Sequence, residues 1–439
     1  MPTDLPQRVS SSLNIAVTPL ARDLSAPTRH PEIALPGREL SRLQLIGLFL
    51  LICAIVAIEA RQGMWNQHLR ADVGEFWLRT ERYLTFQLQG TEYPPFAMLY
   101  FLLLRWGEFA FDVGFEKNFL FASYVLVGLH LAVLNHVAGR RAAILFGVLM
   151  LAAGSIILFR YELLVSFLTL LAWCAWRYNW PRCAGALLAA AILSKLYPLL
   201  LVPLFARRPH GADGRHQLST VGTGLGLGLA AILLFFWFGG DSISSFSGVI
   251  RFHDNKPMAL ESTPAVLAMA FDALRGAWPS HPVNEYSIHG LRLPALYRWL
   301  MQLGLVASLG ALLYSYLRRG GNLILTAQAM LVALIFWTTL FQPQYLIWPA
   351  VFTALLPLTG LEARRLYLMV GLFVLALVSE QIVFPCHYTE FLAIFYEHRP
   401  AGVLIAAIAV GKIALTTLFI LAFQAAWNPP STELVARTD

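Results

Sequence analysis

The chain has 439 residues, of which 58% are hydrophobic and only 13% are charged, and its mean hydropathy is +0.62. This composition excludes an ordinary soluble domain, because too few polar residues are present to cover its surface. The net charge of +7 does not indicate nucleic-acid binding, since the basic residues are scattered between apolar runs and do not form a stripe with aromatics. The sequence predicts a polytopic integral membrane protein.

Both ends of the chain are expected to lie outside the membrane. Residues 1–41 are rich in Pro, Ser, Thr and Arg without helical periodicity, which predicts a disordered cytoplasmic tail. The first apolar run begins too late for a cleaved signal peptide, so we expect it to remain as a signal anchor. The transmembrane domain is expected over 42–425, and residues 426–439 are expected to form a cytoplasmic tail.

Apolar runs of membrane length recur between these tails. A hydrocarbon core of about 30 Å requires roughly 20 apolar residues in a helix. No run alternates as a barrel strand would, so the expected fold is an all-α transmembrane helix bundle of about 11–13 membrane segments. The runs are 43–60, 96–112, 119–139, 142–159, 162–178, 183–206, 218–238, 292–317, 322–340, 344–360, 366–384 and 401–425.

Paired arginines in short turns predict the orientation, because basic turns are usually cytoplasmic. This rule places the long loops 61–95, 239–291 and 385–400 on the extracytoplasmic side. The pairs are Arg207-Arg208, Arg318-Arg319 and Arg364-Arg365.

The first half of the chain conflicts with twelve full crossings. Such crossings would place Arg140-Arg141, Arg177 and Arg182 outside, against the charge rule. Bringing them inside requires two segments to be re-entrant or broken. The candidates are 96–112 and 183–206, and the sequence leaves this choice open.

Loop 61–95 carries a candidate catalytic carboxylate. Aromatic residues are interleaved with charges around Asp72, which predicts a short helix lying in the membrane interface. A carboxylate held there is suited to take a proton from a hydroxyl. Alternatively, Asp72 and Glu75 pair with Arg70 and Arg79 at helical spacing and only solvate the helix.

Two further charged positions interrupt apolar runs. Arg160-Tyr161-Glu162 belongs either to a polar site or to a turn with interfacial anchors. Lys195 follows small and apolar residues, where an ionisable group costs about 2.5–3.5 kcal/mol to insert and normally marks a functional site. Its ammonium suits an anionic phosphate. The alternative is a lysine that reaches the interface at a short helix end.

Loop 239–291 contains a mixed cationic and hydrogen-bonding set, namely Arg251, His253, Lys256 and Glu261. Such a set suits a phosphate or a sugar, although an ordinary solvated loop also contains some of these residues. No His or Cys spacing typical of a metal site is present in the sequence. We therefore expect neither a metal ion nor another cofactor.

A series of short motifs runs in order through nearly the whole chain. They are Asp72, Glu92-Tyr93-Pro94-Pro95, Arg160-Tyr161-Glu162, Ala184-Gly185, Lys195-Leu196-Tyr197-Pro198, His253, Lys256-Pro257, Glu261-Ser262, Gln342-Pro343-Gln344-Tyr345, Trp348-Pro349, Phe384-Pro385 and Tyr388. Their order and spacing resemble the membrane glycosyltransferases of the GT-C superfamily, specifically family 87, the polyprenol-phosphate-mannose-dependent type. In that family Asp is usual at the position of Glu162, and Arg at the position of Lys256.

The resemblance implies a fold, an activity and a set of site residues. It implies an inverting enzyme of the cell membrane that transfers a sugar, expected to be mannose, from a polyprenyl-phosphate donor to a glycolipid or glycan hydroxyl, with Asp72 as general base and no metal. The residues implied to bind the donor phosphate are Lys195, His253, Lys256 and Arg251. Those implied to bind substrate are Glu75, Glu92, Tyr93, Arg160, Glu162, Glu261, Gln344 and Tyr345.

Other functions remain open at this point. A secondary transporter or flippase also has many helices, an intramembrane lysine and broken segments, although no internal repeat of hydropathy is evident. A different sugar, a protein acceptor or a non-catalytic membrane scaffold would fit the same composition.

Overall fold

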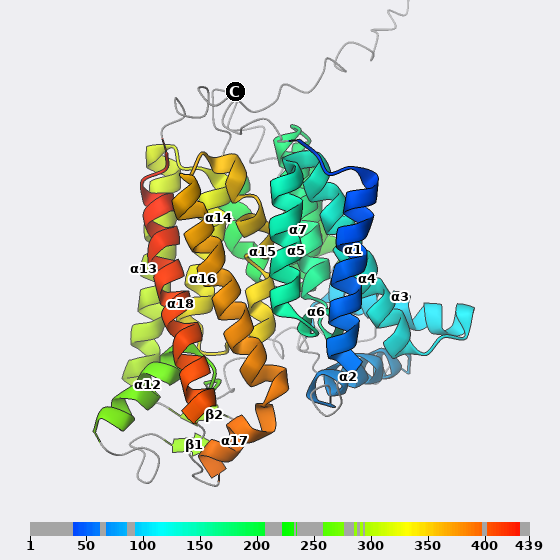
Figure 1. Cartoon of the computed structure of the whole chain (residues 1–439). Coiled ribbons are helices and arrows are strands. Elements are labelled where there is room, and N and C mark those ends of the chain that lie inside the picture. The colour runs from blue at the N-terminus through cyan, green and yellow to red at the C-terminus, as the bar shows by residue number, and fades with distance from the viewer. Residues whose placement is uncertain are drawn as a thin grey trace, which may run out of the picture.

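The structure is a computed structural model that describes residues 38–61, 67–85, 93–206, 222–231, 234, 258–275, 285–287, 290–292, 295–396 and 402–430. It is a helical bundle (Figure 1). The first half contains α1 (Arg42–Arg61), α2 (Gln67–Leu84), α3 (Pro95–Phe111), α4 (Phe115–Ala138), α5 (Arg140–Ala153), α6 (Ile156–Phe159), α7 (Glu162–Arg177), α8 (Pro181–Ser194), the 3₁₀ helix η2 (Tyr197–Leu201) and α9 (Val202–Phe205).

The second half is also mainly helical. Its elements are α12 (Thr263–Leu274), β1 (Glu285–Ser287), β2 (Gly290–Arg292), α13 (Ala295–Arg319), α14 (Leu323–Trp337), η3 (Pro343–Ile347), α15 (Ala350–Ala354), η4 (Leu356–Thr359), α16 (Ala363–Gln381), the π-helical η5 (Ile382–Cys386), α17 (Tyr388–Tyr396) and α18 (Gly402–Trp427).

Five helices of the described chain are long and apolar enough to cross a membrane, and these are α1, α4, α13, α16 and α18. Three shorter apolar helices accompany them, at Pro181–Ser194, Gly222–Ala231 and Leu323–Trp337. The predicted membrane helix bundle is therefore confirmed. The expected 11–13 segments exceed the five long helices because several expected spans are short or broken.

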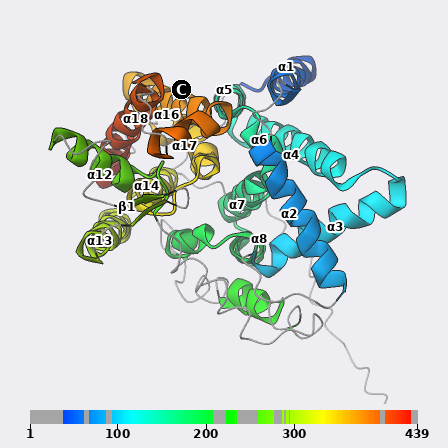
Figure 2. The same cartoon turned by 90° about the horizontal axis from the view of Figure 1, so that it is seen from below.

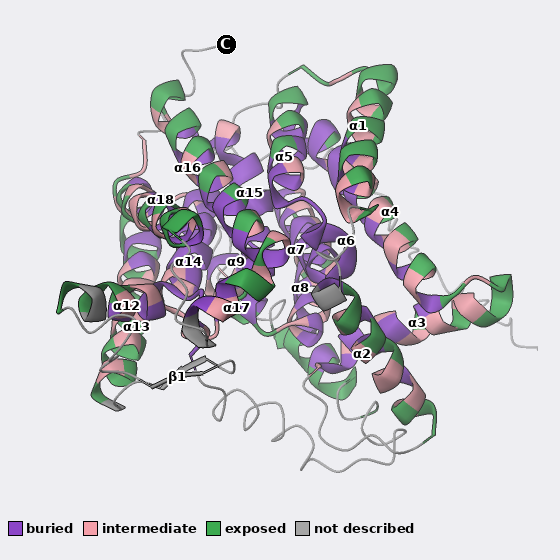
Figure 3. Cartoon of the chain, turned by 60° about the horizontal axis from the view of Figure 1, so that its bottom comes forward, coloured by how far each residue is buried: buried purple, intermediate pink, exposed green. Residues whose placement is uncertain are grey.

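Helix α14 is apolar on all sides and buried along nearly its whole length. A helix of this composition is stable only when neighbours surround it. Its first turn is capped by Asn322, whose side chain accepts hydrogen bonds from the backbone N–H groups of Ile324 and Leu325. Figure 3 shows the buried interior around α14 and α15 and the more exposed surface of α1.

Hydrogen bonds between helix ends show the direction of the first helices. The backbone N–H of Leu40 donates to Asn135 Oδ1 at 2.7 Å, and that of Arg140 donates to the carbonyl of Arg38 at 2.9 Å. Because α1 begins where α4 ends, the two helices run in opposite directions. The segment 96–112 is therefore not a full crossing, and α3 lies with α2 at the lower end in Figure 1.

The segment 183–206 is re-entrant. It starts beside the end of α7, where Arg177 Nη1 donates to the carbonyl of Val137 at 3.0 Å, and α8 breaks at Lys195. It returns to the upper end, where the Tyr316 hydroxyl near the end of α13 donates to the carbonyl of Leu204 at 2.9 Å. Both candidate segments thus behave as the charge rule requires, and Arg140-Arg141 and Arg177 share the end of the bundle with the C-terminus of α18.

The parts of the three long loops that the structure describes gather at the opposite end. Seen from below, α2 and α3 lie on one side, and α12, β1 and α17 lie on the other (Figure 2). The described parts of these loops therefore lie at one end of the bundle. That this face is extracytoplasmic stays a prediction, as do the two cytoplasmic tails, because residues 1–37 and 431–439 lie outside the described residues.

The structure corrects three details of the expected helices. The run 344–360 is not one span but η3, α15 and η4, because Pro349 and Pro357 interrupt it and Gly360 ends it with φ of 71°. The run 142–159 divides at Gly154, whose φ is +56° and whose absent Cβ would lie 2.4 Å from a carboxylate oxygen of Glu59. A short antiparallel ladder, β1 with β2, lies at the end of the expected loop 239–291 and extends to Arg292.

Candidate active site

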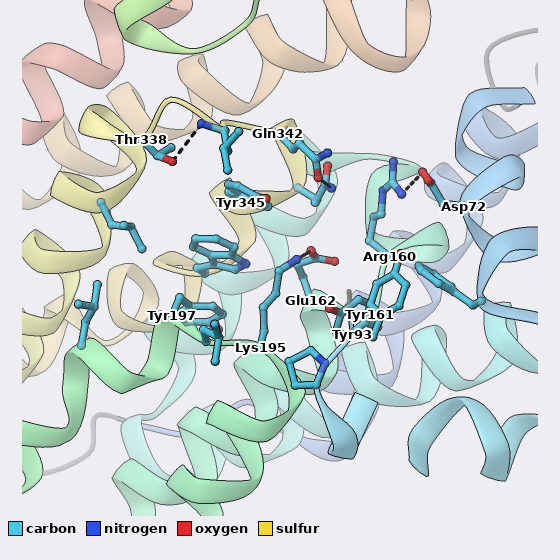
Figure 4. Close-up of a pocket in the computed structure, with 18 residues that line it drawn as sticks. Asp72, Tyr93, Arg160, Tyr161, Glu162, Lys195, Tyr197, Thr338, Gln342 and Tyr345 are labelled. Carbon is cyan, nitrogen blue, oxygen red and sulfur yellow. Dashed lines mark hydrogen bonds and ion pairs between the residues drawn. The ribbon is translucent and has the colours of Figure 1, made fainter. Parts of the chain in front are cut away.

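A cavity of about 430 Å³ lies between the two halves of the chain (Figure 4). Its wall comes from α2, residues 93–94, the junction of α6 and α7, the junction of α8 and η2, the end of α14, and η3. The charged and amide side chains that line it are Asp72, Arg160, Glu162, Lys195, Gln342 and Gln344, and the others are mainly aromatic or apolar. A cavity with few polar groups among apolar and aromatic residues is typical of a small-molecule site.

The position of α2 in the wall follows from its apolar face. Leu69, Val73 and Phe76 recur at helical spacing and are buried. The Phe76 ring stacks on Phe101 of α3, with the ring centroids 4.6 Å apart. Asp72 lies one helical turn before Phe76, and both line the cavity. Aromatic packing of α2 therefore holds the Asp72 carboxylate at the cavity wall.

Asp72 forms an ion pair with Nη1 of Arg160 (Figure 4). Arg160 follows α6 in an extended conformation, with φ of −129° and ψ of 143°. The Asp72 side chain is 36% exposed, whereas that of Arg160 is 10% exposed. A hydroxyl from solvent can thus reach Asp72, while the nearby guanidinium, which stays protonated in proteins, stabilises its ionised form.

A second pair joins Glu162 to Lys195. Glu162 is the first residue of α7, and its side chain is only 1% exposed. Its Oε1 accepts a hydrogen bond from Lys195 Nζ. Lys195 is extended at the break after α8, with φ of −160°, and Pro198 soon follows. Because a buried carboxylate is costly without a cation, this pairing explains why a lysine occurs in an apolar run.

Aromatic rings surround the ammonium of Lys195. Its Nζ lies 5.0 Å from the ring centroid of Tyr161, 5.0 Å from that of Tyr345 and 5.4 Å from that of Trp348. These distances are within the range of cation–π attraction. The ring centroid of Trp348 lies 4.1 Å from that of Tyr345 and 4.4 Å from that of Tyr197. The three rings therefore form a continuous aromatic stack along one side of the cavity, with Trp348 in the middle.

The four charges of the cavity cancel in pairs. An anionic ligand would therefore meet two cations, Arg160 and Lys195, that are already bound to carboxylates. Guanidinium and ammonium groups both bind phosphate, the first as a planar fork and the second as a point charge. The arrangement can hold an anion beside an ionised carboxylate, which is what a transfer reaction with an anionic leaving group requires.

Residues 91–343, more than half of the chain, match glycosyltransferase family 87. The chain belongs to this family. The predicted recognition is confirmed, and the protein is a membrane glycosyltransferase of family 87. The crystal structure of ArnT from Cupriavidus metallidurans in the apo state is similar with a TM-score of 0.43 and 13% identity, over 87% of this chain and 76% of that chain. Among curated proteins, none matches the chain.

The cavity brings together seven of the site residues expected from the sequence of this family 87 protein. Residues far apart in the chain converge there because α2 packs across the α6–α7 junction and η3 packs on α7. The seven are Asp72, Tyr93, Arg160, Glu162, Lys195, Gln344 and Tyr345. Four others, Glu92, Arg251, His253 and Lys256, lie outside the residues that the structure describes.

Glu75 and Glu261 lie elsewhere and do not line the cavity. Glu75 accepts a hydrogen bond from Arg79 Nε at 2.8 Å, the helical pair expected for a solvated face. Asp72 does not take part in such a pair with Arg70. The alternative interpretation of α2 is thus correct for Glu75 alone.

Glu261 is buried behind the cavity wall, near Glu380 and Lys412. Burial raises its pKa to about 7, to which Glu380 adds, while its own backbone hydrogen bond and Lys412 act in the opposite direction. The neighbouring Ala259 N–H donates to the carbonyl of Thr339 at 2.8 Å. Glu261 therefore lies next to the segment between α14 and η3, outside the lining of the cavity, and its substrate-binding role stays a prediction.

Sequence reasoning missed several residues of the wall. Trp348, Tyr161, Tyr197 and Gln342 stand inside the motifs but were not chosen as site residues. Pro94 and Leu196 also stand inside motifs, and Phe76, Leu200, Leu334, Thr338 and Leu340 complete the wall. A leucine within an apolar run does not indicate a site, because leucine is equally suited to face lipid, to pack in the core or to contact a ligand.

Among the residues that the structure describes, no group of three or more His, Cys, Asp or Glu side chains could hold a metal ion. The absence of a metal from the reaction stays a prediction.

Proposed function

We propose that this family 87 enzyme transfers mannose from a polyprenyl-phosphate donor to a hydroxyl of a glycolipid or glycan. The transfer takes place at the extracytoplasmic face of the cell membrane. The observation that carries the proposal is the cavity itself, in which the partly exposed carboxylate of Asp72 lies beside the buried cations Arg160 and Lys195.

The proposed reaction is a single displacement. Asp72 accepts the proton of the acceptor hydroxyl, and the acceptor oxygen forms a bond to the anomeric carbon of the donor sugar. The bond between this carbon and the phosphate oxygen breaks on the opposite face, and the electron pair leaves with the polyprenyl phosphate. The configuration at the anomeric carbon is therefore inverted. Holding both reactants in one cavity supplies the alignment that this step needs.

Arg160 and Lys195 are proposed to stabilise the departing phosphate. Both lie in the cavity wall and are at least four-fifths buried, where a charge interacts more strongly than in water. Arg251, His253 and Lys256 are proposed to contribute from the loop 239–291. A lipid-linked donor suits this geometry because its leaving group is anchored in the membrane that surrounds the bundle.

A secondary transporter or flippase was the alternative function. Membership of a glycosyltransferase family favours sugar transfer. The re-entrant segment 183–206 and Lys195, which had suggested a transport pathway, are accounted for by the cavity wall and by the ion pair with Glu162.

The test is a transfer assay with the purified wild-type protein in liposomes. Polyprenyl-phosphate mannose is the donor, a glycolipid extract is the acceptor, and GDP-mannose and polyprenyl-phosphate glucose are supplied in parallel reactions. We expect a new mannosylated lipid from polyprenyl-phosphate mannose, with the anomeric configuration by NMR opposite to that of the donor. Retained configuration would overturn the single displacement, and efficient transfer from GDP-mannose would overturn the donor class.

A further inference from the structure

We infer that the cavity contains a sugar-recognition subsite made by Glu162 Oε2, Gln344 Oε1 and Trp348 Nε1, with the ring of Tyr345 as its stacking surface. This inference rests on the proposed function and deepens it, because it names the atoms that distinguish a sugar-bearing donor from the lipid phosphate alone. The ligand class is a hexose whose hydroxyl groups both donate and accept hydrogen bonds.

The first observation is a concentration of unsatisfied polar atoms. Glu162 Oε2, Gln344 Oε1 and Trp348 Nε1 are buried and have no hydrogen-bond partner among the described residues. All three residues line the same cavity. A buried polar atom without a partner is unfavourable, so such atoms in a native protein call for an explanation such as a ligand.

The chemical mixture of these atoms matches a sugar. Two are acceptors and one is a donor, whereas a phosphate needs donors only, such as Arg160 Nε, which also lines the cavity without a partner in the described chain. Glu162 Oε1 is already bound to Lys195 Nζ, which neutralises the carboxylate and leaves Oε2 to accept a hydroxyl proton. Gln344 is positioned in the same way, since its amide nitrogen donates to Gln342 Oε1 and leaves its own oxygen without a partner in the described chain.

The second observation is the aromatic stack, in which Trp348 lies between Tyr345 and Tyr197 and leaves the outer face of Tyr345 as the stacking surface. Trp348 and Tyr345 are stacked with an interplanar angle of 22° and with ring centroids 4.1 Å apart. Sugar rings carry apolar C–H faces, and large flat aromatic surfaces bury such faces well. The indole N–H at the edge of this surface can then donate to a hydroxyl of the same ring. Because all three unpaired atoms are covered in this structure, the sugar engages them through small side-chain rotations.

Unpaired buried atoms also occur away from the cavity, and they provide matched controls. Gln328 in α14 is fully buried, and neither of its amide atoms has a hydrogen-bond partner within the described chain. Trp173 in α7 is also fully buried, and its indole nitrogen has no hydrogen-bond partner there. Neither residue lines the cavity. Gln344→Met is therefore compared with Gln328→Met, and Trp348→Phe with Trp173→Phe.

The experiment measures equilibrium binding to the full-length protein in lipid nanodiscs. The two probes are polyprenyl-phosphate mannose and polyprenyl phosphate without sugar. The wild type should bind the mannose-bearing lipid more tightly. Each cavity variant should lower this preference about 3- to 10-fold, the range expected for one neutral hydrogen bond, with the affinity for polyprenyl phosphate unchanged. The control variants should keep the wild-type preference.

The outcomes separate the inference from the function on which it rests. If the wild type prefers mannose but Gln344→Met and Trp348→Phe keep that preference, the subsite is wrong and the donor class stands. If the wild type binds both lipids equally, the subsite is again overturned while the lipid phosphate remains a ligand. If the wild type binds neither lipid, both the proposed donor and the proposed subsite are wrong.

Discussion

Removal of Lys412 tests how the wall of the cavity is supported. Lys412 of α18 forms an ion pair with Glu380 of α16, and the two side chains are 5% and 4% exposed. Its Nζ also lies 3.9 Å from the ring centroid of Phe341, which is fully buried in the segment between α14 and η3. Glu261 is the second carboxylate near this ammonium. Lys412 thus joins two membrane helices to the back of the cavity wall.

The loss of stability expected for Lys412→Met follows from the burial of the charge that it leaves unpaired. Lys412→Met leaves Glu380 buried without its cation, and breaking a buried pair in this way costs about 3–5 kcal/mol. At about 2 °C per kcal/mol for a large domain, the midpoint of thermal unfolding should fall by about 6–10 °C. The double variant Glu380→Gln with Lys412→Met removes both charges, so it should recover most of this loss.

The assay is thermal unfolding of the purified protein in detergent, with wild type, single variant and double variant in the same buffer. A single variant that unfolds within about 1 °C of the wild type would refute the reasoning. So would a double variant that is less stable than the single one, because the cost would then not arise from an uncompensated charge.

Three further predictions concern the cavity and its surroundings. Phe76→Ala should destabilise the docking of α2 by about 3–5 kcal/mol and lower transfer activity, whereas Phe109→Ala on the exposed face of α3 should leave activity unchanged in the same assay. Because burial raises the pKa of Glu261 to about 7, the folded state favours the protonated carboxyl. Stability should therefore fall as the pH rises from about 4.5 through 7, and Glu261→Gln should flatten this dependence in unfolding curves recorded across that range. Lys195→Met should lower stability by about 3–5 kcal/mol because Glu162 loses its cation, and Lys195→Met with Glu162→Gln should restore thermal stability without restoring transfer.

The membrane helix bundle could be predicted from the sequence because hydropathy over a span is a local property. The charge rule also indicated that two segments are not full crossings, since Arg140-Arg141 and Arg177 had to share one side, but it named 96–112 and 183–206 only as candidates. The division of 344–360 was not predicted, because its composition is as apolar as that of a continuous helix and only its prolines and Gly360 break it.

The candidate site was predictable where a charge interrupts an apolar run. Arg160, Glu162 and Lys195 stood out in this way, and all three line the cavity. Asp72 and Glu75 looked equivalent in the sequence because both lie in one amphipathic stretch. Their difference depends on which face of α2 packs on α3, which is a tertiary property that helical spacing alone does not reveal.

The sequence could not predict which of these charged residues pair with one another. Asp72 pairs with Arg160 and not with a residue of its own helix, because α2 folds back across the α6–α7 junction. Trp348 was visible only as part of a short motif, since a tryptophan in a membrane protein usually lies at the interface. Its contact with Lys195 required the breaks at both α8 and η3.

The central claim is that Asp72 is the base of a glycosyl transfer. The most direct measurement compares the transfer rates of Asp72→Asn and Glu75→Gln at saturating donor and acceptor, with binding of polyprenyl-phosphate mannose measured on the same preparations. Both changes neutralise a carboxylate of α2, but only Asp72 lines the cavity. We predict that Asp72→Asn lowers the rate by about 10²- to 10⁴-fold, the usual contribution of a general base, while donor binding is kept and Glu75→Gln stays close to the wild type. A wild-type rate for Asp72→Asn would contradict the account.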